Sequence, residues 1–270
     1  MLKSWLVRAR QGHRTVPYPG PLPALPERLR GLPVLQPEKC RSGCAECVAA
    51  CPTGALSKGP QGLRLDLGRC LFCGECEAAC PDGAVRFTND PRMAARRRDD
   101  LVLGGDGPRL AAALGDESRR LFGRSLRLRV VSAGGCNGCE VEVNVLNTIV
   151  FDLGRFGIQF VASPRHADGL LITGPVTRNM ELALRKTWEA VPGPRLVIAV
   201  GACAISGGPY AGHPEQLDGA AGVVPVDLFV PGCPPHPLGI LDGLLRLLGR
   251  IHGETGRAPF RRSESTMRKP

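Results

Sequence analysis

Residues 70–81 read CLFCGECEAACP, four cysteines spaced Cys-x2-Cys-x2-Cys-x3-Cys with a proline directly after the last one. A near copy precedes this stretch. Residues 44–56 (CAECVAACPTGAL) and 73–85 (CGECEAACPDGAV) carry three cysteines, a proline and a Gly-Ala pair at matching positions. Self-similarity of this kind indicates a duplicated structural unit. We therefore expect two equivalent cysteine-rich loops to determine how this part of the chain folds.

The second cysteine run matches the spacing of bacterial 4Fe-4S binding loops in full. The first run, Cys40-x3-Cys44-x2-Cys47-x3-Cys51, has one residue more between its first two cysteines, where Ser42 and Gly43 can form a small bulge. In such signatures the fourth cysteine binds the cluster of the other run. The expected ligand sets are a first quartet of Cys40, Cys44, Cys47 and Cys80 and a second quartet of Cys51, Cys70, Cys73 and Cys76.

Zinc is the structural alternative for these cysteines. Zinc sites usually pair two separated Cys-x2-Cys knuckles, whereas here three cysteines fall in one tight loop. Three thiolates that are close in sequence suit three corners of one cubane cluster. The spacing favours two 4Fe-4S clusters over a basic, zinc-binding interaction protein.

The composition fits a protein of a reducing compartment. Twelve cysteines in 270 residues are far below the density of a disulfide-stapled miniprotein. The N-terminus, MLKSWLVRAR, lacks an apolar stretch followed by a small-residue cleavage site. No run approaches the roughly 18 apolar residues of a membrane span. We expect a cytoplasmic protein that is soluble or peripheral to a membrane.

The basic charge does not point to a nucleic acid partner. The formal net charge of +10 counts every cysteine as neutral, whereas an oxidised 4Fe-4S cluster with its four thiolates contributes about −2. The remaining cations gather in patches such as Arg96, Arg97 and Arg98. Aromatic residues make up only 4% of the chain, and no recognition helix is apparent.

Changes in composition divide the chain into five regions. Residues 1–36 are rich in proline, which favours extended backbone, and we interpret them as an arm laid over a partner, with a disordered leader as the alternative. Residues 37–90 hold the cysteine repeat and are expected to fold as an α+β ferredoxin-like two-cluster domain. Residues 91–124 read as a linker that carries one helix, 125–255 as a second domain and 256–270 as a basic tail.

The second domain alternates apolar, strand-like runs with amphipathic helical stretches. The runs LRLRVVS, FVAS, GLLITGP, RLVIAVGAC and LFVPGC each lead to a turn, most of them through Gly or Pro. This alternation predicts an α/β flavodoxin-like domain with a mostly parallel sheet, helices on both of its faces, and sites at the carboxyl ends of the strands.

The four remaining cysteines lie in the turns of this domain. Cys136, Cys139, Cys203 and Cys233 each follow a predicted buried strand, so a parallel sheet would bring them to one edge. We define these residues as the third quartet. The spacing alone leaves a zinc site or unrelated core thiols open, because widely separated single cysteines are often buried as small apolar side chains.

Four motifs of this domain carry a resemblance to a known family: CNGCEVE (136–142), ITGPVT (172–177), GACAISGG (201–208) and PGCPP (231–235). Together they resemble the small subunit of membrane-bound, energy-converting group 4 NiFe hydrogenases and the related B subunit of NADH:quinone oxidoreductase (complex I). The N-terminal half, from YPGPLP through GRCLFCGECEAACP, is similar to the ferredoxin subunit of formate hydrogenlyase. The chain thus resembles two neighbouring subunits fused end to end.

The resemblance implies that the third quartet holds a proximal 4Fe-4S cluster beside a large subunit with a Ni-Fe centre. It also implies an electron-transfer subunit with three 4Fe-4S clusters and no catalytic residue of its own. The implied partners are the NiFe hydrogenase-like large subunit, membrane ion-translocating subunits, and a donor or acceptor module such as formate dehydrogenase or ferredoxin. The separated Cys136-x2-Cys139 favours the hydrogenase branch, since the complex I version has two adjacent cysteines.

An alternative within the same class is a complex I-like assembly that lacks nickel and reduces a quinone. Two further residues are candidates for tuning the third quartet. His236 follows PGCPP where the family usually has arginine, so a group that titrates near neutral pH replaces a cation. Its other interpretation is a loop histidine with satisfied hydrogen bonds. Glu142 matches an acidic position of the family motif, but an acid in the first turn of a helix is also favourable on its own.

Overall fold

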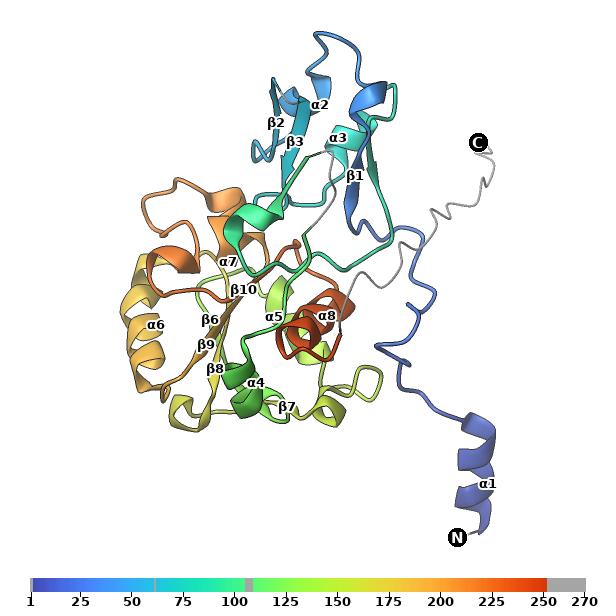
Figure 1. The fold of residues 1–270 in the computed structure, drawn as a ribbon, viewed down its shortest axis with the longest axis vertical. Helices are drawn as coiled ribbons and strands as arrows, with labels where there is room; N and C mark the ends of the chain where they lie inside the picture. Colours follow the sequence, from blue (N-terminus) through green and yellow to red (C-terminus); the bar gives the residue numbers. More distant parts are fainter. Residues whose placement is uncertain (1, 61, 105–108, 252–270) are drawn as a thin grey trace.

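The computed structural model describes residues 2–60, 62–104 and 109–251, so the basic tail expected at 256–270 lies outside the described residues. Figure 1 shows a larger body built on a five-stranded sheet and a smaller body that holds the cysteine repeat. The N-terminal helix, α1 (Leu2–Gln11), projects away from both.

The five-stranded sheet is parallel throughout, with the strand order β10-β9-β8-β6-β7. Its strands are β6 (Leu126–Ser132), β7 (Ile158–Phe160), β8 (Gly169–Thr173), β9 (Leu196–Val200) and β10 (Leu228–Val230). In sequence order the arrangement is 2-1-3-4-5, the order of flavodoxin-like sheets. The expected mostly parallel sheet is confirmed. All residues of β8 and β9 are buried, which explains why their sequences are apolar without alternation.

Helices cover both faces of this sheet. The larger-body helices are α4 (Asp116–Phe122), α5 (Gly138–Val145), α6 (Arg178–Ala190), α7 (Ala202–Ser206) and α8 (Pro237–Leu247). In Figure 1, α6 lies on one side of the sheet, and α5 and α8 lie on the other. Every residue of α8 is buried, so this helix is an internal element rather than a surface helix.

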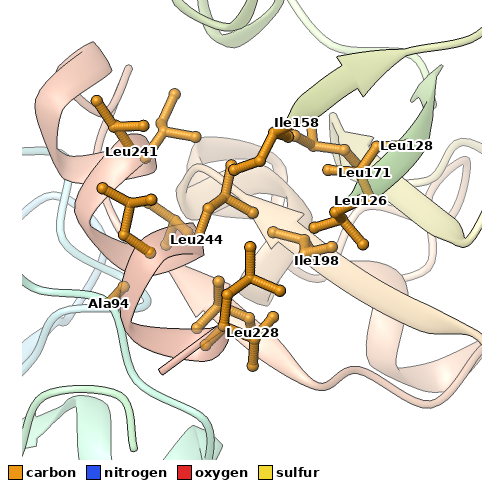
Figure 2. Packing of buried hydrophobic residues seen from close by; sticks show 14 of the residues in the cluster. Ala94, Leu126, Leu128, Ile158, Leu171, Ile198, Leu228, Leu241 and Leu244 are labelled. Carbon is orange, nitrogen blue, oxygen red and sulfur yellow. The ribbon is translucent and has the colours of Figure 1, made fainter. Parts of the chain in front are cut away.

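The main core lies between α8 and the sheet. Figure 2 shows Leu244 of α8 pointing toward Leu171 and Ile198 of the sheet. These three side chains have no exposed surface, and burying one such side chain contributes about 1.5–3 kcal/mol. The packing fixes α8 against one face of the sheet.

The smaller body contains two short antiparallel sheets and two short helices. Strand β1 (Pro33–Leu35) pairs with β4 (Val85–Phe87), and β3 (Gly62–Asp66) pairs on either side with β2 (Leu56–Gly59) and β5 (Val102–Leu103). The helices α2 (Glu46–Ala49) and α3 (Glu75–Ala78) occupy equivalent positions in the two copies of the repeat. The region we expected to be a linker, 91–124, therefore supplies a strand, β5, to this body and the helix α4 to the larger one.

The two bodies share an apolar core. Ile205 and Phe229 of the larger body belong to the same buried cluster as Leu65 and Leu67 of the smaller body. Ala95 and Phe229 exchange two backbone hydrogen bonds of 3.0 and 2.8 Å. The Ser206 hydroxyl donates to the Gly68 carbonyl at 2.8 Å. Residues from both cysteine-bearing regions are thus held in direct contact rather than merely tethered.

Residues 16–25 of the proline-rich arm pack on the arm's own chain, and the placement of the arm over a partner remains a prediction. The Val16 N–H donates to the Val150 carbonyl at 2.8 Å, and Leu22 and Leu25 pack against the main core. The buried Tyr18 hydroxyl donates to Asp242 of α8 at 2.5 Å. Burial raises the pKa of Tyr18, as does the charge of Asp242, so the hydroxyl keeps its proton.

The arm begins with α1, which exposes Trp5, Leu6 and Val7. In the described part of the chain, no helix has the length and apolar character needed to cross a membrane.

We predict that Tyr18→Phe lowers the stability of the holoprotein. The buried Asp242 carboxylate would keep the 2.7 Å hydrogen bond from Arg246 Nε to its Oδ2, but its Oδ1 would lose the hydrogen bond from the Tyr18 hydroxyl. An unpaired buried acceptor costs about 1–3 kcal/mol, which corresponds to a decrease of about 2–4 °C in Tm per kcal/mol for a protein of this size. Tyr210→Phe, at an exposed tyrosine, is the control in a calorimetric comparison. Equal Tm changes for the two variants would contradict the prediction.

Candidate functional site

The structure brings the cysteines of the repeat together across its two copies. Burial raises the pKa of the Cys47 thiol, and the charges of Cys80, Cys40 and Cys44 raise it further. The four residues that interact in this way are the members of the first quartet. Cys80 belongs to the second cysteine run, so its position beside the first run is the crossing expected from the signature.

The second quartet shows the same crossing in the opposite direction. Burial raises the pKa of the Cys70 thiol to about 12, the Phe72 N–H lowers it, and the charges of Cys76, Cys51 and Cys73 raise it. A small hollow is lined by all four of these cysteines and by apolar side chains that include Leu65 and Phe87. The ligand assignment remains a prediction, but the residues it names lie together.

Backbone N–H groups point at the sulfurs of both quartets. The Ala55 N–H lies 3.2 Å from Cys51 Sγ, the Ala84 N–H lies 3.2 Å from Cys80 Sγ, and the Phe72 N–H lies 3.3 Å from Cys70 Sγ. At Cys51, burial raises the pKa, but the N–H groups of the following loop outweigh burial, so the pKa is lowered overall. These N–H groups favour the thiolate, the form in which cysteine binds metal.

The third quartet gathers at the carboxyl-terminal edge of the parallel sheet. Cys136 and Cys139 follow β6, Cys203 lies in α7 after β9, and Cys233 follows β10. Burial raises the pKa of Cys139, and the charges of Cys203, Glu140, Cys233 and Cys136 raise it further. Cys136 and Cys233 are exposed, whereas Cys203 is buried. This quartet therefore opens onto the surface of the chain.

Glycines make room for the third quartet. A Cβ at Gly201 would lie 2.4 Å from Cys139 Sγ, and one at Gly208 would lie 2.8 Å from Cys203 Sγ. Both glycines have positive φ, +91° and +56°, which other residues rarely adopt. The motif GACAISGG thus combines a ligand candidate with the two backbone positions that let the sulfurs approach.

Glu140 and Glu142 have different environments. Glu140, next to Cys139, is buried, and its Oε1 accepts hydrogen bonds from Ser132 at 2.6 Å and Thr173 at 2.7 Å. It anchors the start of α5 to β6 and β8, a role that the sequence analysis missed. Glu142 is half-buried, and burial raises the pKa of its carboxyl.

His236 has a defined structural role. Its Nδ1 accepts a hydrogen bond of 3.1 Å from the Leu238 N–H and caps the N-terminus of α8. Burial lowers the pKa of this imidazole, which favours the neutral, capping form. The tuning roles of His236 and Glu142 remain predictions.

Members of the second quartet interact with a member of the first quartet and with a member of the third. Burial raises the pKa of Cys76 to about 12, and among the weaker causes is the charge of Cys47 in the first quartet. Burial also raises the pKa of Cys233, followed by the charges of Cys136 and of Cys73 in the second quartet. The second quartet therefore has members close to both of the others.

Each quartet offers four cysteine sulfurs, the donor set that 4Fe-4S clusters use. Within residues 2–60, 62–104 and 109–251, no three His, Cys, Asp or Glu side chains are arranged to hold one metal ion. Each thiolate of a 4Fe-4S cluster binds a different iron, so its ligands stand farther apart than the four ligands of one zinc. The N–H groups at Cys51, Cys70 and Cys80 supply hydrogen bonds of the kind that the sulfurs of such clusters accept.

Two family models match the chain. Residues 136–247 match the family described as NADH ubiquinone oxidoreductase, 20 kDa subunit, and residues 39–84 match the 4Fe-4S dicluster domain. The first range contains the third quartet, and the second contains all eight cysteines of the other two.

Three relatives align with slightly less than half of the chain. The probable membrane-bound hydrogenase subunit of Pyrococcus furiosus is 42% identical over 49% of this chain and 79% of its own length. Formate hydrogenlyase subunit 7 of Escherichia coli is 44% identical over 47% of this chain and 50% of its own length. The B subunit of the NADH-quinone oxidoreductase of Heliobacterium modesticaldum is 41% identical over 44% of this chain and 69% of its own length.

We predict that Gly201→Ala selectively disrupts the third quartet, because the added methyl group would collide with Cys139 Sγ. The purified protein should lose about 4 irons, one cluster's worth, and keep the others. Gly212→Ala is the matched control, since Gly212 also has positive φ (+79°) but has nothing within 4 Å of its added Cβ. Iron and acid-labile sulfide analysis measures the loss, and an equal loss in both variants would refute the steric explanation.

We also predict a pH dependence of stability from His236. Because its pKa is lowered in the folded protein, the stabilisation by the neutral ring is complete above the ordinary value of about 6.5. It is lost as the pH falls through the lowered value. His236→Asn keeps a capping side chain but does not titrate. As the pH falls below about 6.5, the Tm of the wild type should therefore decrease relative to that of this variant.

His213→Asn is the control for this experiment. The exposed His213 makes the same kind of contact, with its Nδ1 accepting from the Glu215 N–H at 3.2 Å. A similar pH trend in both variants would contradict an effect specific to the buried ring.

Proposed function

The chain belongs to the family of the NADH ubiquinone oxidoreductase 20 kDa subunit, and on this basis we propose that it is the electron-transfer subunit of a membrane-associated NiFe hydrogenase of the formate hydrogenlyase kind. The 4Fe-4S dicluster domain at residues 39–84 adds a second cluster-binding region to the family domain. The chain is a subunit of an oxidoreductase complex of the energy-converting hydrogenase and complex I type. The hydrogenase branch and the number of clusters are our proposal.

Each quartet is proposed to hold one 4Fe-4S cluster, which accepts and donates single electrons when bound. The chain's own residues position the thiolates, shield them from water and donate N–H groups to their sulfurs. Cys47, Cys76 and Cys203 are buried, which keeps water from the inner side of each quartet. Ala55 and Ala84 donate to the crossing cysteines of the repeat. Such contacts and burial are the means by which a protein sets a cluster's potential.

The proximity of the second quartet to members of the other two is the observation that carries this proposal. Cys47 of the first quartet interacts with Cys76 of the second, and Cys73 of the second interacts with Cys233 of the third. The hydrogen bond between Ser206 and Gly68 joins α7, which carries Cys203, to the turn that precedes Cys70. This proximity supports a path with an entrance at the first quartet and an exit at the third, or the reverse.

The third quartet suits contact with a large catalytic subunit. Cys136 and Cys233 are exposed in the isolated chain, which would leave a cluster there accessible to water. Val141 and Ile149 on the same part of the chain are 51% and 72% exposed. An apolar partner surface that covers Val141, two residues after Cys139, together with Cys136 and Cys233 would bury the quartet. We propose that this partner is the NiFe hydrogenase-like large subunit, and that membrane ion-translocating subunits complete the complex.

A complex I-like assembly that reduces a quinone is the second candidate. The match to the NADH-quinone oxidoreductase of Heliobacterium modesticaldum supports it. The separated cysteines of CNGC favour the hydrogenase, as inferred from the motif. Copurification of the large subunit decides between the two, because a Ni-Fe centre requires two Cys-x2-Cys pairs in that partner. Hydrogen-dependent reduction of this chain within the complex would support the hydrogenase, and quinone reduction without nickel would support the alternative.

We predict that the chain purified without oxygen contains about 12 irons and about 12 acid-labile sulfides. Cys203→Ser should retain about 8 of each, because one ligand of one cluster is removed from the buried side. Electron paramagnetic resonance of the reduced protein checks that the missing signal belongs to one cluster. Two or three zincs without sulfide would contradict the proposal and favour the zinc-binding interaction protein.

A further inference from the structure

The loop between Cys40 and Cys44 contains three residues, one more than the equivalent loop between Cys70 and Cys73. The shorter loop stabilises its own first thiolate, because the Phe72 N–H donates to Cys70 Sγ at 3.3 Å. Both loops place a left-handed residue directly before the second cysteine, Gly43 at φ +76° and Phe72 at φ +54°. The longer loop keeps this turn but must bring Cys40 to the cluster by another route.

Lys58 provides the contact that the longer loop lacks. Its ammonium group lies 3.5 Å from Cys40 Sγ, 3.3 Å from the Arg41 carbonyl and 2.9 Å from the Cys44 carbonyl. A lysine ammonium has three donors, and three acceptors of this one loop surround it. Two of them belong to Cys40 and Cys44, so a single side chain holds both ends of the extended loop.

The position of Lys58 follows from the hairpin. Lys58 is the third residue of β2, and Leu56 is the first and is buried. Alternate residues of a strand share a face, so Lys58 is on the same side as Leu56. That strand begins after Cys51 and Pro52, the end of the first cysteine run. Lys58 pairs with Leu63 of β3, and this register fixes the position of the Lys58 backbone.

The loop is held from its other side by Arg41. Its Nε donates to Asp82 at 2.5 Å, and Asp82 lies two residues after Cys80, the crossing member of the first quartet. Hydrogen bonding to Asp82 raises the pKa of Arg41, as does the carboxylate charge. Arg41, the first residue of the longer loop, is thus joined to the segment that carries Cys80.

We propose that Lys58 is a positioning residue for the cluster of the first quartet: it fastens the extended Cys40–Cys44 loop and places a cation on the Cys40 thiolate. The inference rests on the proposed function, since it assumes that this quartet binds a cluster. A reduced cluster is more negative than an oxidised one. A neighbouring cation therefore favours the reduced form, and the potential of this cluster rises.

The test compares three variants of the full-length protein. Lys58→Met removes the ammonium and keeps much of the aliphatic chain, while Lys58→Arg keeps a cation. Arg64→Met is the matched control, because Arg64 is exposed on β3 opposite Ser57, on the other face of the same hairpin. Redox titration followed by electron paramagnetic resonance gives the potentials, with the first-quartet signal identified by its absence in Cys47→Ser. Iron and sulfide are measured on each sample.

Lys58→Met should reduce the equilibrium constant for reduction of this cluster about tenfold, which is about 59 mV for one electron. The shift should shrink at about 1 M salt, where exposed charges are screened within about 3 Å. Loss of about 4 irons with the other clusters intact would also support the proposal. In Lys58→Arg the equilibrium constant for reduction should differ from that of the wild type by no more than about twofold, because the positive charge remains.

Unchanged iron and potential in Lys58→Met, or a change no larger than in Arg64→Met, would overturn the proposal. Loss of iron from all three quartets would also overturn it, because Lys58 would then act in folding of the whole chain. Wild-type protein without iron and sulfide would instead refute the proposed function. The two failures are therefore distinguishable.

Discussion

The cost of burying a thiolate governs this structure. Burial raises the pKa of Cys70, Cys76 and Cys203, so each sulfur in isolation would favour the neutral thiol. Four sulfurs held together add mutual repulsion to that cost. The structure offsets it with N–H donors in the loops and with one ammonium group at Cys40. The larger share of the compensation has to come from the positive metal centres that the quartets would hold.

The gathering of the repeat's cysteines and the parallel sheet could be predicted from the sequence, because both depend on local patterns. The run Cys70–Pro81 places three thiolates in one loop, and the continuous apolar runs of β8 and β9 require a sheet covered on two faces. Pairing across the repeat followed from the known behaviour of the signature. The sheet edge at which the third quartet lies followed from parallel strands.

The features that were missed depend on contacts between distant residues or on single side chains. No local pattern indicates that Tyr18 will contact Asp242, or that the arm will cover its own chain. Val102 and Leu103 form a strand only because β3 offers them an edge. No local pattern places Glu140 beside Ser132 and Thr173, which reach it from two neighbouring strands. The role of Lys58 depends on the hairpin register, which the sequence does not specify.

The arm also has a consequence for how the protein is made. Tyr18 leaves the ribosome 224 residues before its partner Asp242. The internal helix α8, which receives the arm, is also needed to complete the main core. Domains generally fold as units during synthesis, N-terminal ones first. Here an early segment has to wait for a much later one, so the buried contact between Tyr18 and Asp242 can form only after α8 has been translated.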